Sequence, residues 1–71
     1  MAFDFRKLKG RIIQAYGAIY LFAKKLGISN NSFSRKLNNK VRFSVDDIVE
    51  ISSLLDIPPN EIGAYFFTEK V

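Results

Sequence analysis

Apolar residues recur every three or four positions along this 71-residue chain, and no stretch alternates apolar and polar residues with a period of two. This spacing is typical of amphipathic helices, whereas half-buried strands require alternation. The first apolar stripe consists of Phe5, Leu8, Ile12 and Ala15. We therefore expect an all-α fold of five short helices. A chain of this length has room for one hydrophobic core, so residues 1–71 should form a single compact domain.

Helix boundaries follow from residues that typically begin and end helices. Asp4 is the expected N-cap of a first helix, and Gly17 is its expected C-terminal glycine. A second helix should run over about residues 18–26 and stop at Gly27. Its expected buried residues are Phe22, Ala23 and Leu26.

Ser29 and Ser44 are the expected N-caps of two further helices, because apolar residues on either side of each serine can pack together as a hydrophobic staple. The two staples are Ile28 with Phe33 and Phe43 with Ile48. Asp47 should complete a capping box at Ser44. The third helix should end near Asn38, and Pro58 and Pro59 should close the fourth and open a fifth.

Composition limits the chemistry open to the chain. It contains no cysteine and no histidine, so it lacks a thiol nucleophile and the side chain that most often serves as general base or metal ligand. A chain of this size also has little room for an enclosed pocket. We expect a binding module rather than an enzyme, with no metal, cofactor or small-molecule ligand. The longest apolar run, residues 18–23, is far shorter than the ~20 residues of a membrane span, so we expect a cytoplasmic protein.

Charge is divided unevenly along the sequence. Residues 1–43 carry ten of the eleven basic residues and one acid, whereas residues 44–71 carry one basic residue and six acids. The first part therefore has a formal charge of +9 and the second a formal charge of −5. A strongly positive surface attracts polyanions, of which nucleic acid is the commonest, although basic residues can also serve only to keep a surface solvated.

The segment over about residues 18–38 has the spacing of a helix-turn-helix. Ala23 lets two helices cross closely, Gly27 permits the turn between them, and Phe33 can lock the second helix beneath the first. The residues resemble those of the phage repressor and Cro family in the run FAxxLGIS…FSRxxNxK. The resemblance covers essentially the whole chain. It implies a lambda-repressor-like domain of five helices that regulates transcription.

The outward face of the third helix is the expected DNA-reading surface. With Phe33 and Leu37 directed inward, steps of 100° per residue place Asn31, Arg35 and Asn38 on the opposite side. Arginine can pair with guanine and asparagine with adenine, and no acid lies between residues 29 and 39. A polar face that is merely solvated, with asparagine and serine serving as caps, is the alternative.

The resemblance also implies roles for individual residues. Base reading falls to Asn30, Asn31, Ser32 and Arg35. Phosphate contacts fall to Lys36, Asn38, Asn39, Lys40 and Arg42, of which the last two could equally be solvated loop charges. The implied function is a sequence-specific regulator that places its third helix in the major groove of a double-stranded operator. It would bind as a weak homodimer, with a set of C-terminal residues either contacting the second copy or closing the core: Tyr65, Phe66, Phe67 and Val71.

The start of the second helix departs from the family pattern. The family usually has a capping Ser, Thr or Asn where this chain has Ala18, and a phosphate-binding glutamine where it has Ile19. Ile19 and Tyr20 could instead form a small apolar patch for another protein, or could simply pack against the first helix. The patch supports an alternative function, in which the chain is an antirepressor that binds a partner repressor and covers its DNA-binding surface.

Overall fold

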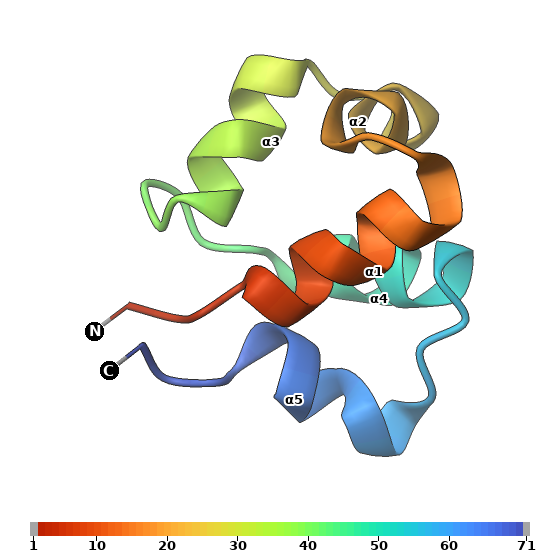
Figure 1. Cartoon of the computed structure of the whole chain (residues 1–71). Helices are drawn as coiled ribbons and strands as arrows, with labels where there is room; N and C mark the ends of the chain where they lie inside the picture. The colour runs from red at the N-terminus through yellow and green to blue at the C-terminus, as the bar shows by residue number, and fades with distance from the viewer. Residues whose placement is uncertain (1, 71) are drawn as a thin grey trace.

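Five short helices surround one hydrophobic core (Figure 1). The computed structural model describes residues 2–70. Its elements are α1 (Arg6–Tyr16), α2 (Ile19–Leu26), α3 (Asn30–Leu37), α4 (Val45–Leu54), the 3₁₀ turn η1 (Pro59–Glu61) and α5 (Ile62–Phe66). Over the described residues there is no β-strand, only an isolated bridge between Phe3 and Glu69. The all-α, five-helix domain predicted from the apolar spacing is confirmed, and none of the helices in this range is long and apolar enough to cross a membrane.

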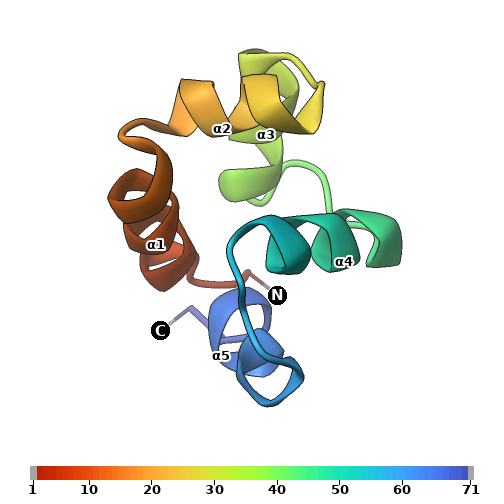
Figure 2. The same cartoon turned by 90° about the vertical axis from the view of Figure 1, so that its right-hand side faces the viewer.

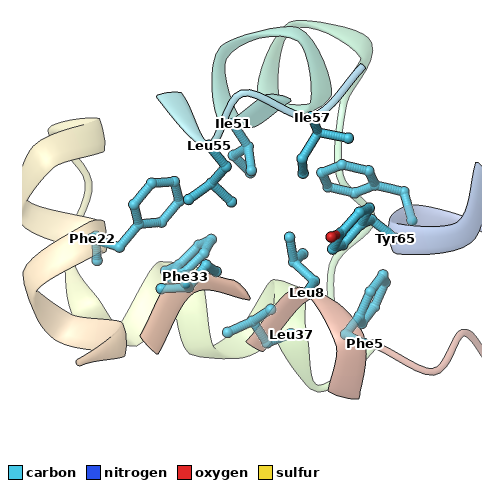
Figure 3. Close-up of a cluster of buried hydrophobic side chains, with 12 residues drawn as sticks. Phe5, Leu8, Phe22, Phe33, Leu37, Ile51, Leu55, Ile57 and Tyr65 are labelled. Atoms are coloured by element: carbon cyan, nitrogen blue, oxygen red, sulfur yellow. The ribbon is translucent and has the colours of Figure 1, made fainter. Parts of the chain in front are cut away.

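The core is built largely from phenylalanine. Phe22 of α2, Phe33 of α3 and Phe66 of α5 are buried, and Figure 3 shows side chains from several helices pointing into one interior. The rings of Phe22 and Phe33 lie 5.8 Å apart. Phe43 precedes α4 and lies 5.2 Å from Phe5 and 5.5 Å from Phe66. Ring contacts therefore connect the N-terminal segment, the loop before α4 and α5.

The apolar stripe of α1 differs from the prediction at its C-terminal end. Leu8 and Ile12 are fully buried, but Ala15 is exposed. Tyr16 takes the next inward position, and its ring lies 4.8 Å from that of Phe22. The prediction of Ala15 was wrong because three-residue and four-residue steps both fit a helical repeat, and here the larger side chain reaches the core.

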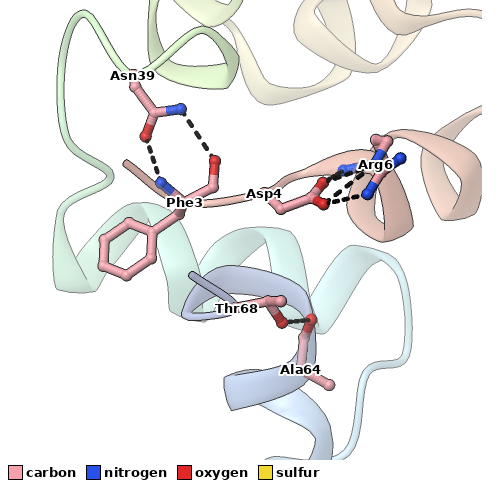
Figure 4. Close-up of polar contacts among 6 residues, drawn as sticks. All are labelled: Phe3, Asp4, Arg6, Asn39, Ala64 and Thr68. Carbon is pink, nitrogen blue, oxygen red and sulfur yellow. Dashed lines mark hydrogen bonds and ion pairs between the residues drawn. The ribbon is translucent and has the colours of Figure 1, made fainter. Parts of the chain in front are cut away.

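Asp4 caps α1 from one residue further away than predicted. The helix begins at Arg6, and Phe5 occupies the N-cap position without a side-chain hydrogen bond. The Asp4 carboxylate accepts the backbone N–H of Arg6 at 2.9 Å (Figure 4). The N-cap assignment to Asp4 is therefore corrected, although its carboxylate still satisfies a free N–H at the start of the helix.

The predicted starts of α3 and α4 are confirmed. The Ser29 hydroxyl accepts the N–H of Ser32 at 3.0 Å. The Ser44 hydroxyl accepts the N–H of Asp47 at 3.0 Å, and the Asp47 carboxylate accepts the N–H of Ser44 at 2.9 Å. These two bonds form the capping box. Both helices are therefore fixed at their N-termini by side chains that are recognisable in the sequence.

The two ends of the described chain lie side by side (Figure 1). The N–H of Asp4 donates to the carbonyl of Thr68 at 2.7 Å, and the N–H of Lys70 donates to the carbonyl of Ala2 at 2.9 Å. These bonds hold the N-terminal segment against the residues that follow α5.

Candidate binding surfaces around the helix-turn-helix

α2 and α3 form the predicted helix-turn-helix around Gly27. This glycine has a φ of 80°, in the left-handed region that glycine adopts readily. The N–H of Ile28 donates to the carbonyl of Ala23 at 3.2 Å and closes the end of α2. Ala23 is buried, and so is Phe33. Figure 2 shows the short turn between the two helices at the top of the molecule.

The outward face of α3 carries the residues predicted to read bases. Asn30, Asn31, Ser32 and Arg35 are all exposed, and α3 contains no acidic residue. The Ser32 hydroxyl accepts a hydrogen bond from Ser29 at 2.9 Å. Among the described residues, neither Asn31 nor Arg35 has a side-chain hydrogen-bond partner or ion pair, so both are free to meet a ligand. Their role in reading bases stays a prediction.

Two of the side chains predicted to contact phosphate are engaged within the molecule. The Lys36 ammonium forms an ion pair with the Asp47 carboxylate of α4. The Asn39 amide accepts the N–H of Phe3 at 2.9 Å and donates to its carbonyl at 3.0 Å (Figure 4). The expectation that Lys36 and Asn39 are free for phosphate is corrected, because Lys36 is held by Asp47 of the next helix and Asn39 by the backbone of Phe3, 36 positions away.

The other predicted phosphate contacts remain on the surface. Asn38 is exposed and donates to the Ser34 hydroxyl at 3.2 Å. Lys40 and Arg42 are exposed, and the Arg42 guanidinium lies 5.8 Å from the centre of the Phe3 ring. A weak cation–π contact therefore orients Arg42.

The pKa of Asp47 reflects its position between α3 and α4. Partial burial alone would raise the pKa of this carboxyl, but the hydrogen bonds from Lys36 and Ser44 outweigh burial and lower it below the usual value. Asp47 is therefore held as a carboxylate that joins the two helices.

A groove of about 300 Å³ lies where α1, α2 and α3 meet. Its lining residues are Lys9, Ile19, Asn30, Ser34, Leu37 and Asn38. Ile19 is half-buried and packs against the core, so local packing explains this residue better than an exposed apolar patch does. The prediction that Ile19 and Tyr20 form an exposed apolar patch is therefore corrected for Ile19.

Tyr20 is nevertheless exposed, and the structure adds a neighbour that sequence reasoning missed. Tyr20 is 61% exposed and Leu21 is 42% exposed. Lys24 and Lys25, one helical turn further along α2, are exposed beside them. We call these four residues the helix-2 surface. It combines an aromatic and an aliphatic side chain with two positive charges.

The C-terminal residues predicted for dimer contacts differ in their exposure. Tyr65 is buried and Phe66 is only 2% exposed, so both close the core and cannot contact a second copy. Phe67 is 53% exposed and lies edge-on to Phe3 at 5.8 Å. Val71 lies outside the described residues. Of the described residues that were predicted to contact a second copy, Phe67 alone is exposed enough to do so.

The outer face of α4 carries a second surface that sequence reasoning missed. Val45 is 77% exposed and Val49 is 61% exposed, and Asp46 and Glu50 are exposed beside them. We call these four residues the helix-4 surface. The sequence offered one signal for it, because Val45 and Val49 lie off the stripe formed by Ile48, Ile51 and Leu55.

These features define a small all-helical domain with helix-turn-helix geometry. The chain belongs to the family DUF739, described as proteins of unknown function, whose model matches residues 1–69. Among solved structures it is similar to the solution structure of the modulator of repression (MOR) of the temperate bacteriophage TP901-1 from Lactococcus lactis. That similarity has a TM-score of 0.85 and 38% sequence identity, and it covers 100% of this chain and 96% of the other. No curated protein matches the sequence.

Proposed function

We propose that this chain is a bacteriophage regulator that modulates repression by binding a partner repressor protein through the helix-2 surface. The observation that carries this proposal is the similarity to the phage modulator of repression, which has 38% identity over the whole chain. Such a regulator would act where repressor and operator meet, in the cytoplasm of the bacterial host.

The composition of the helix-2 surface supports a protein partner. Tyr20 and Leu21 expose apolar area without contributing to the buried core. Tyrosine is enriched at the centres of protein interfaces because its ring is large and rigid and its hydroxyl can find a polar partner. Two exposed lysines beside the apolar pair would favour a repressor surface that is apolar with an acidic rim.

The state of the predicted DNA-contacting residues also favours a protein partner over an operator. Where the repressor and Cro family has a phosphate-binding glutamine, this chain has Ile19, which packs against the core. Lys36 and Asn39 are held by Asp47 and by the Phe3 backbone. The chain therefore has fewer free groups for phosphate than its net charge suggests.

Calorimetric titration against a phage repressor encoded in the same genome tests the proposal. Tyr20→Ala should weaken binding by about 2 kcal/mol, as expected for an aromatic side chain that becomes buried in the centre of an interface. Arg35→Ala is the matched control, because it truncates an exposed side chain on α3 and should leave the affinity unchanged. The proposal fails if the wild-type protein does not bind the repressor, or if Tyr20→Ala binds as tightly as the wild type.

A second candidate function is the Cro-type or repressor-type DNA-binding regulator. It is favoured by the outward face of α3, where Asn31 and Arg35 are exposed and no carboxylate is present. Phe67 is the exposed side chain available for a weak dimer contact.

Operator binding at two salt concentrations separates the two functions. A DNA reader should bind its own promoter region with an affinity that falls steeply as salt rises. Asn31→Ala and Arg35→Ala should then each cost about 1–3 kcal/mol, whereas Tyr20→Ala should have little effect. If neither α3 substitution changes DNA binding, this second function is excluded.

A further inference from the structure

The helix-2 surface and the helix-4 surface have complementary chemistry. Each combines two exposed apolar side chains with two exposed charges, and each spreads them over consecutive turns of one helix face. The helix-2 surface consists of Tyr20, Leu21, Lys24 and Lys25, and the helix-4 surface consists of Val45, Val49, Asp46 and Glu50. The charges are positive on α2 and negative on α4, so this chain itself carries the apolar and acidic surface that its helix-2 surface would favour in a partner.

The charges on both surfaces are unpaired within the part of the chain that the structure describes. Its ion pairs join Arg6 to Asp4 and Lys36 to Asp47, and none involves the lysines of α2 or the exposed acids of α4. Figures 1 and 2 place α2 at the top of the molecule and α4 near mid-height, above α5. Among the described residues, no hydrogen bond or ion pair joins the two surfaces within one molecule.

The exposed valines of α4 have no role in the stability of this domain that the structure reveals. Val45 and Val49 remain 77% and 61% exposed, and valine is a weaker helix former than alanine, glutamate or lysine. Apolar side chains rimmed by charges are typical of interaction sites. The helix-4 surface therefore has the composition of a docking site for a cationic partner.

We propose that the helix-4 surface of one molecule binds the helix-2 surface of a second copy. This inference rests on the proposed function, because the helix-2 surface is the one assigned there to the repressor. The contact is head-to-tail, since the two surfaces differ. It covers the helix-2 surface until a repressor displaces the second copy, so self-association limits how much free modulator is available.

The size and charge of the two surfaces predict a weak and salt-sensitive contact. Single faces of an eight-residue helix and a ten-residue helix bury less area than a stable protein interface requires. Exposed charges are also screened by salt. Self-association should therefore be visible at high protein concentration and low ionic strength, and should decline on dilution or on addition of salt.

Sedimentation velocity of the full chain tests the contact through charge reversal. The wild type should sediment faster as its concentration rises. Lys24→Glu/Lys25→Glu and Asp46→Lys/Glu50→Lys should each weaken this association at least about tenfold, because like charges then face each other. An equimolar mixture of the two double variants should associate again, because opposite charges are restored across the contact.

Folding controls keep the charge reversal interpretable. Asp46 lies in the first turn of α4, where lysine would oppose the helix dipole. The neutral pair Asp46→Asn/Glu50→Gln should therefore be measured beside the reversal, with circular dichroism of every variant. The inference is overturned if the wild type stays monomeric at all concentrations, if the folded variants associate like the wild type, or if the mixture fails to associate.

Repressor binding by the same variants separates this inference from the proposed function. Asp46→Asn/Glu50→Gln should bind the repressor at least as tightly as the wild type, because it frees the helix-2 surface. If it loses repressor binding, α4 belongs to the repressor contact and the self-association proposal is overturned. If the repressor is bound through Tyr20 but no self-association occurs, the proposed function stands and this inference fails. Self-association without any repressor binding would support the contact between copies and overturn the proposed function.

Discussion

α3 and α4 begin in the same way and present opposite outer surfaces. Each starts at a serine whose hydroxyl accepts a backbone N–H in the first turn, and each buries one apolar face in the shared core. The outer face of α3 carries asparagine, serine and arginine without any acid, whereas that of α4 carries exposed valines and acids. The comparison shows that caps and buried faces determine where the helices lie, while their outer faces are left open to function.

The largest difference in unfolding free energy should separate a substitution at a buried position of these helices from one at an exposed position. Phe33→Ala removes a buried ring from contact with Phe22 and Phe43 and should lower the free energy of unfolding by about 3–5 kcal/mol. Val49→Ala, on the outer face of α4, should change it by less than about 0.5 kcal/mol. Urea unfolding measures both. If Phe33→Ala does not fold, Phe33→Leu provides a smaller, measurable loss, and similar losses at both positions would contradict the structure.

A smaller contrast should separate two neighbouring acids of α4. Asp47→Ala removes the capping-box acceptor and the partner of Lys36, so it should lower the free energy of unfolding by about 1–2 kcal/mol. Asp46→Ala is the matched control and removes only a favourable charge in the first helical turn, worth about 0.3–1 kcal/mol. Urea unfolding at neutral pH distinguishes them, and equal losses would show that the link between α3 and α4 adds nothing.

The contribution of Asp47 should also depend on pH. Because its pKa is lowered in the folded protein, its stabilisation is fully present above the value of about 3.9 that aspartate has in an unfolded chain. The stabilisation is lost as the pH falls through the folded value. The difference in unfolding free energy between the wild type and Asp47→Ala should therefore shrink in acid. A difference that stays constant down to about pH 2 would rule out this origin.

The smallest stability effect should come from the ion pair between the partly buried Asp4 and the exposed Arg6. The Arg6 guanidinium and backbone N–H hydrogen-bond to the Asp4 carboxylate and lower its pKa to about 2. Arg6→Ala should raise the pKa of Asp4 toward its usual value and, by linkage, lower the free energy of unfolding at neutral pH. The loss should be small, because solvent screens this ion pair. A carboxyl-carbon NMR titration measures the pKa. A value that remains near 2 in the variant would show that the guanidinium is not responsible.

Local signals in the sequence predicted most of the fold. The serines at 29 and 44, the glycines at 17 and 27 and the prolines at 58 and 59 mark helix boundaries, because their side chains and backbone preferences act within a few residues. The spacing of Ala23, Gly27 and Phe33 likewise predicted the helix-turn-helix. Such signals depend on neighbours along the chain and can therefore be recognised without coordinates.

The candidate sites were predicted less completely, because they depend on contacts between distant segments. Lys36 and Asp47 are joined across two helices, and Asn39 binds the backbone of a residue 36 positions away. A polar residue paired in this way looks like a free ligand-binding group in the sequence. Apolar residues are equally ambiguous in a sequence, because they can belong either to a core or to an interface. Tyr65 and Phe66 were predicted to contact a second copy or to close the core, and the packing of α5 places both in the core.

Displacement of an operator from its repressor would show whether this protein acts on the repressor or on the DNA. Fluorescence anisotropy of a labelled operator bound by the repressor would be followed as this protein is added, with Tyr20→Ala and Arg35→Ala in parallel. We expect the wild type and Arg35→Ala to release the operator, Tyr20→Ala to leave it bound, and the protein alone to leave the anisotropy of the operator unchanged. Binding of the operator by the protein alone, abolished by Arg35→Ala and unaffected by Tyr20→Ala, would contradict the proposed function.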